Sequence, residues 1–337
     1  MILRQSAKNP ADIEKRAASL ESAAEKNEMM SLVIEVTSTC NLVCTFCDLH
    51  ALQKTHGDQM KPRMLMKDSV FEELITQLKG CSFKFKEINM HGVGEPLMNK
   101  NILKMIEQVK GANVGEKITM STNGILMSPD KFEALASTGL DEVVVSLDTV
   151  DSDRYQEIKG KPMRNLLENI DFAIQYVQKT RSIHLVIKCF EPRDTYGLST
   201  KDSDQIIAKY GDTAANSEFI HIKIVPEWTW PIQAGKNEKT DHSPCEIPFY
   251  QLNVHADGRV SCCCLDIRHE LSVGQINPGG SLNDILFGPQ LKSIQMDMLS
   301  GNLKNLPGCL KCDNRPMSKL TSEPKKMMNI VSERNVK

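Results

Sequence analysis

Residues 34–47 read IEVTSTCNLVCTFC, a short apolar run that leads into three closely spaced cysteines, Cys40, Cys44 and Cys47. Cysteine thiolates favour zinc or iron-sulfur centres among the metals that proteins bind. A closed structural zinc site takes four protein ligands, whereas three thiolates leave one position of a metal centre free. The spacing therefore indicates an iron-sulfur cluster with one open iron. The alternative is a zinc loop that takes a distant fourth ligand.

The loop resembles the Cys-x3-Cys-x2-Cys loop of the radical SAM enzymes, in which an aromatic residue, here Phe46, precedes the last cysteine. In that family the loop holds a 4Fe-4S cluster whose open iron binds S-adenosylmethionine (SAM). One electron then cleaves the sulfonium and produces a 5'-deoxyadenosyl radical. The resemblance implies that this chain binds such a cluster and SAM, with Phe46 beside the cofactor.

Composition narrows the class of protein. The chain of 337 residues has eleven cysteines and a net charge of −2. No segment contains an apolar run long enough to span a bilayer. The first 30 residues are rich in charge and lack the apolar stretch of a secretory signal. We therefore expect a cytoplasmic monomer that binds neither nucleic acid nor membrane, and whose cysteines serve metals rather than disulfides.

Short β-branched runs alternate with amphipathic helical stretches over the first two thirds of the chain, which is typical of strand-helix units around a parallel sheet. The expected strands are 32–37, 87–92, 117–123, 142–148, 184–190 and 221–227. The expected helices are 68–79, 99–110, 128–138, 165–180 and 200–210. Six units predict an α/β fold, a partial (β/α)6 TIM-like barrel, which is also the fold that the resemblance implies.

The pattern changes after about residue 235, where Asp257-Gly258 joins two strand-like runs in a hairpin and a helix is expected over 281–299. The chain is thus predicted to have four parts. They are a charged helical extension at 1–30, the radical SAM core at 31–235, an auxiliary hairpin-and-helix module at 236–317, and a flexible tail at 318–337.

Candidate SAM-binding residues follow the strands, at the end of a parallel barrel where ligands bind. Gly94-Glu95-Pro96 is similar to the family's Gly-Gly-Glu-Pro motif, with Val93 in place of the first glycine. By resemblance, the backbone at Gly94 receives the SAM amino group and Glu95 pairs with it. Further polar groups point to the ribose or carboxylate of SAM, each with an ordinary loop or surface role as the alternative: Ser121, Asn123, Ser146 and Lys188.

A second metal centre is indicated by the pattern Cys245-x17-Cys263-x45-Cys309-x2-Cys312. Four thiolates fully ligate either a 4Fe-4S cluster or the zinc of a zinc ribbon. The pattern resembles the Twitch module, the single-cluster form of the SPASM domain, with spacing especially similar to that in the aminocyclitol dehydrogenase of butirosin biosynthesis. The choice of Cys263 over Cys262 or Cys264 rests on the Gly258-x4-Cys spacing of that module.

Two clusters suit a reaction in which a substrate radical passes an electron to the second cluster. Oxidation of a secondary alcohol in a sugar or aminocyclitol, or its epimerisation, fits this scheme, with an electron donor such as flavodoxin or ferredoxin. We expect Glu227, which precedes Trp228 and Trp230, to contact the substrate or accept a proton. The alternatives are a peptide maturase and a zinc-stabilised scaffold without catalysis.

Overall fold

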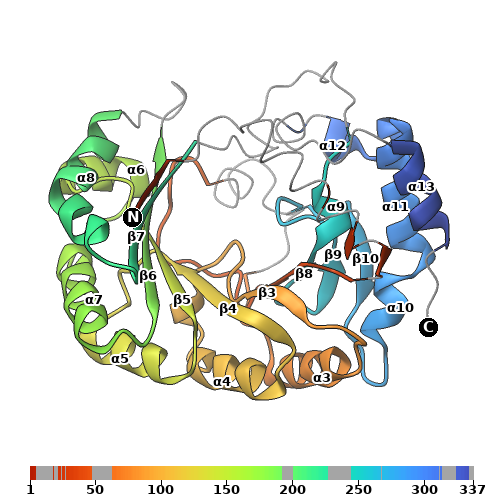
Figure 1. Ribbon diagram of the computed structural model, residues 1–337, viewed down its shortest axis with the longest axis horizontal. Coiled ribbons are helices and arrows are strands. Elements are labelled where there is room, and N and C mark those ends of the chain that lie inside the picture. The colour runs from red at the N-terminus through yellow and green to blue at the C-terminus, as the bar shows by residue number, and fades with distance from the viewer. Residues whose placement is uncertain are drawn as a thin grey trace.

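The computed structural model describes residues 1–4, 18, 22–23, 25–26, 28–47, 63–191, 200–226, 244–266, 268–310, 312 and 324–333. Its centre is a curved sheet in which ten described strands follow the order β1-β7-β6-β5-β4-β3-β2-β8-β9-β10. Helices cover the convex side of this sheet, and the C-terminal elements close one edge (Figure 1). The result is an open, half-barrel shape.

Six parallel strands form the main part of the sheet and confirm the predicted partial barrel. They are β2 (Ser31–Ile34), β3 (Phe85–Asn89), β4 (Gly115–Thr122), β5 (Glu142–Ser146), β6 (His184–Glu191) and β7 (Ile220–Pro226). The helices between them are α3 (Asp68–Lys79), α4 (Ile102–Ala112), α5 (Pro129–Ser137), α6 (Ser152–Lys159), α7 (Leu166–Thr180) and α8 (Thr200–Ala215). The sequence pattern predicted five of these helices and missed α6.

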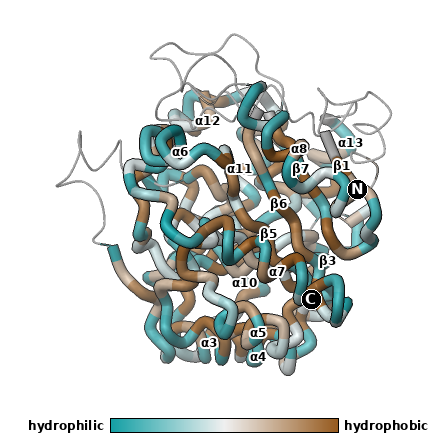
Figure 2. Tube along the Cα trace, turned by 90° about the vertical axis from the view of Figure 1, so that its left-hand side faces the viewer, coloured by the Kyte–Doolittle hydropathy of each residue, from teal (hydrophilic) through white to brown (hydrophobic). Residues whose placement is uncertain are grey.

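Alternation along the strands separates an apolar outer face from a polar inner face. On β5, Val143 and Val145 are fully buried against the helices, whereas Val144 and Ser146 are only partly buried and belong to the other face. Apolar residues dominate along β5 and β6, and the surrounding helices alternate between apolar and polar (Figure 2). The core therefore lies between sheet and helices, which leaves the barrel interior to polar side chains.

The N-terminal segment adds a strand that the sequence did not predict. β1 (Ile2–Arg4) pairs in parallel with β7, with Ile2 opposite Ile222. The amino group of Met1 donates to the carbonyl oxygen of Ala214 and to that of Ile220. The expected helical extension over 1–30 is therefore wrong for residues 2–4, because an apolar pair at the start of the chain can complete the open edge of β7.

The predicted hairpin at Asp257-Gly258 is confirmed. β8 (Gln251–Val254) pairs antiparallel with β9 (Arg259–Ser261), and β10 (Ser272–Gln275) follows β9. Gly258 has a φ of 82°, which a side chain would strain. β8 also pairs in parallel with β2, so the C-terminal part continues the barrel sheet.

The remaining elements are short helices: α9 (Ile247–Tyr250), α10 (Leu282–Leu286), α11 (Pro289–Ser300), η2 (Pro96–Met98), η3 (Leu303–Asn305), α12 (Pro307–Leu310) and α13 (Pro324–Glu333). The single helix expected over 281–299 is split at Gly288–Pro289, because proline cannot continue the hydrogen bonding of a preceding helix. The prediction of a flexible tail is wrong for residues 324–333, where α13 packs on α11 and buries Met327 and Val331. Among the described helices, none combines the length and apolar character needed to cross a bilayer.

Candidate active site

The three-cysteine loop follows β2 and is fastened to the end of α6. The amide of Val43 donates to the carbonyl oxygen of Lys159 at 3.1 Å, and the amide of Thr45 donates to that of Ile158 at 2.9 Å. Gly160 follows α6 with a φ of 68°, and a Cβ there would lie 2.5 Å from Cγ2 of Val43. The helix that the sequence pattern missed is therefore the support on which the loop rests.

The thiols of this loop fit a metal cluster by their environment. Burial raises the pKa of Cys44 to about 11 and raises that of Cys40, while the nearby ammonium of Lys159 opposes the rise at Cys44. A buried thiol stays neutral at pH 7 unless a cation shares its charge, and a coordinated metal ionises it. The donor set, three thiols on one loop at the carboxyl ends of the strands, therefore suits the iron-sulfur cluster that the sequence indicates.

Phe46 and Lys159 form the wall beside this loop. The ring of Phe46 meets that of Phe190 edge to face at 5.9 Å, and Nζ of Lys159 lies 4.9 Å from the centre of the Phe46 ring. Lys159 also forms a buried ion pair with Asp148, whose other oxygen accepts from the amide of Phe190 at 3.2 Å. This network fixes the loop to the ends of β5 and β6.

The Gly94-Glu95-Pro96 loop lies directly against the residues that precede Cys40. A Cβ on Gly94 would lie 2.3 Å from the carbonyl oxygen of Thr37 and 2.5 Å from that of Thr39, so only glycine permits this approach. The amide of Glu95 donates to the carbonyl oxygen of Thr39 at 2.7 Å. The motif is therefore built into the support of the cysteine loop.

Glu95 has a buried side chain that is 2% exposed. Its carboxylate accepts from Thr122 Oγ1 at 2.6 Å, from the amide of Asn123 at 2.7 Å and from the amide of Leu97 at 3.1 Å. Burial raises the pKa of Glu95, and these three donors oppose the rise. The carboxylate thus links β3 to β4, and its expected pairing with SAM stays a prediction.

The other candidate SAM contacts lie on neighbouring strands. The side-chain amide of Asn123 donates to Oδ1 of Asn41 in the cysteine loop at 2.7 Å, so it supports that loop directly. Ser121 and Ser146 are partly buried on the inner face, and their hydroxyls have no protein hydrogen bond within the described residues. Lys188 is opposite Ser146 in the β5–β6 pairing, with Nζ 5.1 Å from the centre of the Phe190 ring. Their contacts with SAM stay predictions.

The structure brings the predicted auxiliary cysteines together. Cys245 precedes α9, Cys263 follows β9, and Cys309 and Cys312 belong to the end of α12 and the residues after it. Burial raises the pKa of Cys309 well above its usual value, and Cys245 and Cys312 are close enough to raise it further. Cys245 and Cys309 likewise act on the pKa of Cys263. Four thiols from three segments therefore form one group, in which Cys245 is buried and the other three are partly buried.

The neighbours of Cys263 have different surroundings. The thiol of Cys262 is fully buried, lies 3.8 Å from the carbonyl oxygen of Leu271, and is also close enough to Cys309 to raise the pKa of that thiol. A hydrogen bond with Cys263 lowers the pKa of Cys264 to about 7. No three His, Cys, Asp or Glu side chains in the described part of the chain meet at a single-ion site. The choice of Cys263 stays a prediction.

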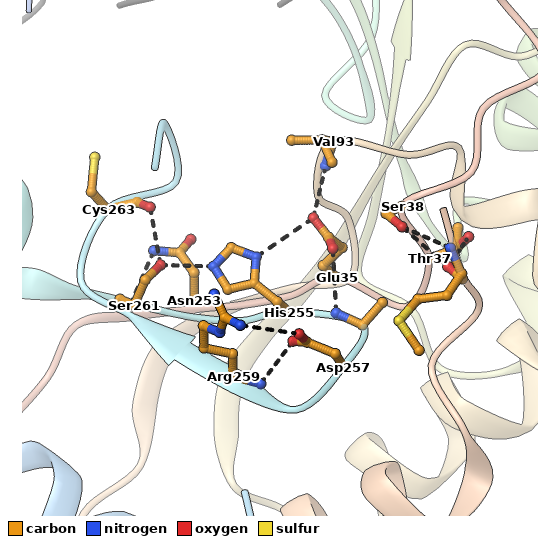
Figure 3. Close-up of polar contacts among 12 residues, drawn as sticks. Glu35, Thr37, Ser38, Val93, Asn253, His255, Asp257, Arg259, Ser261 and Cys263 are labelled. Carbon is orange, nitrogen blue, oxygen red and sulfur yellow. Dashed lines mark hydrogen bonds and ion pairs between the residues drawn. The ribbon is translucent and has the colours of Figure 1, made fainter. Parts of the chain in front are cut away.

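Glu35, which the sequence pattern did not single out, connects the two sets of cysteines (Figure 3). Its carboxylate accepts from the amides of Val93 and Ala256, both at 3.3 Å, and lies 3.8 Å from Nδ1 of His255. Nε2 of His255 is 2.8 Å from Oγ of Ser261. The sequence feature that could have identified Glu35 is its position as a charged residue inside an apolar strand-like run.

Ser261 completes the connection, because its hydroxyl donates to the carbonyl oxygen of Cys263 at 3.3 Å. Glu227, Trp228 and Trp230 lie outside the described residues, so the expected substrate contact of Glu227 is not placed.

Comparison with known proteins adds two domain matches. The Radical SAM superfamily model matches residues 34–193, and the SPASM iron-sulfur cluster-binding domain model matches residues 245–313. The chain carries a radical SAM domain followed by a SPASM domain. Such domains imply 4Fe-4S clusters, in agreement with the buried thiols at both sites.

Curated proteins similar to this chain include GTP 3',8-cyclases. That of Clostridium perfringens (strain 13 / Type A) is 36% identical over 235 residues, which is 69% of this chain and 66% of the relative. The probable GTP 3',8-cyclase of Methanocaldococcus jannaschii is 34% identical over 149 residues, or 44% of this chain and 46% of the relative. The matches thus span less than two thirds of these relatives. The expected resemblance is correct for the domains, but these relatives are not aminocyclitol dehydrogenases.

Two solved structures share the fold of this chain. BtrN in complex with AdoMet and 2-DOIA has a TM-score of 0.57 and 18% identity, and covers 88% of this chain and 97% of its own. Native anSMEcpe with bound AdoMet has a TM-score of 0.59 and 13% identity, and covers 90% of this chain and 100% of its own. At these identities the likeness concerns the fold.

Proposed function

We propose that this protein cleaves SAM and removes a hydrogen atom from a small-molecule substrate held inside the barrel. The observation that carries the proposal is the three-cysteine loop at the carboxyl ends of the strands, above a polar inner face. Cys40, Cys44 and Cys47 are the ligands of the first cluster in this proposal. A 4Fe-4S cluster held by these three cysteines would bind SAM at its open iron and would supply the electron that cleaves the sulfonium.

The chain's own residues orient these groups. Lys159 places a positive charge beside Cys44 and so favours the thiolate form that a metal requires. Gly94 brings backbone close to the cysteine loop, where it can receive the SAM amino group. Ser121 and Ser146 offer hydroxyls to the ribose or carboxylate of SAM. Phe46 packs against Phe190 and so fixes the position of the loop at the end of β6.

For the substrate, we propose a polyhydroxylated ring whose secondary alcohol becomes a ketone. The alcohol loses one hydrogen atom to the deoxyadenosyl radical, then one electron and one proton. The four cysteines of the SPASM region support an oxidation, because a fully ligated cluster accepts an electron and binds no substrate. Glu227 is our candidate for the proton acceptor. Return of hydrogen to the opposite face would give epimerisation instead.

A second candidate reaction is a radical modification of a nucleotide. The specific observation in its favour is the 36% identity with the GTP 3',8-cyclase of Clostridium perfringens. Both candidates need an external reductant such as flavodoxin or ferredoxin, and both use the same first step.

Anaerobic reconstitution followed by isotope tracing tests the proposal. We expect about eight iron and eight sulfide per chain, and SAM cleavage on reduction. Deuterated aminocyclitols and sugars are then compared with deuterated GTP. Deuterium in 5'-deoxyadenosine from the ring compounds supports the alcohol oxidation, and deuterium from GTP supports the nucleotide reaction. Stoichiometric zinc without SAM cleavage would refute both and support a scaffold.

A further inference from the structure

We propose that Lys188 and Lys223 together bind one anionic group of the substrate, a phosphate or a carboxylate, on the inner face of the barrel. This inference rests on the proposed function, because it assigns a chemical class to the substrate of the same site. It goes further by naming the two side chains that would select that class.

The two lysines are neighbours on one face of the sheet. They are directly paired in the parallel register of β6 and β7. The residues that flank them, Cys189 and Ile222 among others, are fully buried in the core, so Lys188 and Lys223 project to the opposite, inner face. Both are partly buried. Two ammonium groups from adjacent strands therefore enter the same space.

A third group from the far side of the barrel faces this pair. His91 follows β3, which is separated from β6 by β4 and β5. Burial, and then the charge of Lys188, lowers the pKa of His91 to about 4. The charge of Lys188 acts on His91 across the interior of the barrel, because β3 and β6 are not neighbouring strands. Nδ1 of His91 is buried without a hydrogen-bond partner in the described residues, so this polar atom is available to a ligand in the barrel interior.

The charges around the pair do not balance. Asp148 is the carboxylate that acts on Lys188, and it already forms a buried ion pair with Lys159. Neither Lys188 nor Lys223 has an ion pair with a carboxylate in the part of the chain that the structure describes. By contrast Lys117, on the inner face at the other end of β4, lies 2.9 Å from Glu142. The unbalanced charge is thus specific to the end that carries the cysteine loop.

A phosphate or carboxylate is the ligand that would balance the positive charge of Lys188 and Lys223. Two ammonium groups donate charge-assisted hydrogen bonds to the oxygens of a phosphate or carboxylate. Ser146, opposite Lys188 in the next strand, adds a hydroxyl donor at the same level. The pair lies on β6 and β7, whereas the loop proposed for the SAM amino group follows β3. This separation favours a substrate group over the SAM carboxylate, so this inference replaces the SAM contact that the sequence suggested for Lys188.

Binding of inorganic pyrophosphate and of SAM to the reconstituted protein tests the inference by calorimetry at constant ionic strength. Lys188→Met and Lys223→Met should each weaken pyrophosphate binding about tenfold or more and leave SAM affinity unchanged, since each removes one charged donor. Lys223→Arg should retain most of the affinity. Lys117→Met, which removes an inward lysine of the opposite end, is the matched control and should match the wild type.

The inference is overturned if the wild type does not bind pyrophosphate, if both methionine variants bind it as tightly as the wild type, or if Lys117→Met loses as much affinity as they do. Loss of SAM binding with pyrophosphate unchanged would assign the lysines to the SAM carboxylate and would also overturn it. SAM cleavage by the wild type is measured separately, so a protein that cleaves SAM but ignores both lysines loses only this inference.

Discussion

The carboxylate of Glu35 lies 3.8 Å from Nδ1 of His255 and thereby joins the strand that leads to the cysteine loop with the hairpin that leads to Cys263. The two side chains are 9% exposed, and the same carboxylate accepts from two backbone amides, those of Val93 and Ala256. This side chain therefore adds to the β2–β8 pairing in holding the two cysteine groups in one relative position.

Replacement of Glu35 by alanine should lower the free energy of unfolding by about 1–3 kcal/mol, because two buried amides lose their acceptor. Thermal unfolding of the reconstituted protein measures this change. Glu116→Ala is the control, since Glu116 pairs with Lys86 at an exposed site, where water screens the attraction between the two charges. Equal midpoints for the two variants would show that the Glu35 contacts contribute nothing beyond a surface ion pair.

The sequence predicted what local patterns encode. Short β-branched runs predicted the six central strands, and two of the candidate residues that follow them, Glu95 and Asn123, contact the residues around Cys40. The missed features depend on contacts between distant residues. β8 joins β2 through residues separated by more than 200 positions, and Glu35 meets His255 over a similar distance. Short elements such as α6 and β1 carry too few residues for a clear period, so only tertiary packing defines them.

Gly160→Ala should displace the cysteine loop. The new Cβ would lie 2.5 Å from Cγ2 and 2.8 Å from the carbonyl oxygen of Val43, at a φ that disfavours any side chain. Gly301→Ala is the matched control, because Gly301 has a φ of 73° with no atom within 4 Å of its Cβ position. Both variants suffer the backbone strain, about 1 kcal/mol. Only Gly160→Ala should also lose iron on reconstitution. Equal iron contents would mean that Val43 yields without moving the cysteines.

Cys44→Ala should abolish SAM cleavage, because two thiolates do not hold a cluster that needs three. The measurement is 5'-deoxyadenosine after anaerobic reduction. Cys81→Ala is the control, since the Cys81 thiol lies 3.7 Å from the carbonyl oxygen of Gln77, a residue of the outer helix α3. Retained deoxyadenosine formation in Cys44→Ala would refute the assignment of the loop.

Replacement of both Cys309 and Cys312 by alanine should remove about four iron atoms per chain and leave part of the SAM cleavage, because the first loop is intact. Product formation should disappear if the second site accepts the electron. Iron analysis, deoxyadenosine and product are measured on the same sample. Unchanged product with reduced iron would assign the second site a structural role.

Stability should depend on pH through Lys188. Burial lowers the pKa of Lys188 from 10.5 to about 8, with Lys159 and Lys223 adding to the shift and Asp148 opposing it. Between these two pKa values the unfolded chain binds more protons than the folded one, so stability rises with pH across this window. Lys188→Met should therefore be more stable than the wild type at pH 7, by at most about 3 kcal/mol, since water screens part of the charge. Its advantage should shrink as the pH rises through 8 toward 10.5. Denaturant unfolding of both proteins at several pH values measures the difference, and a difference that does not change with pH would contradict the assigned burial of this ammonium.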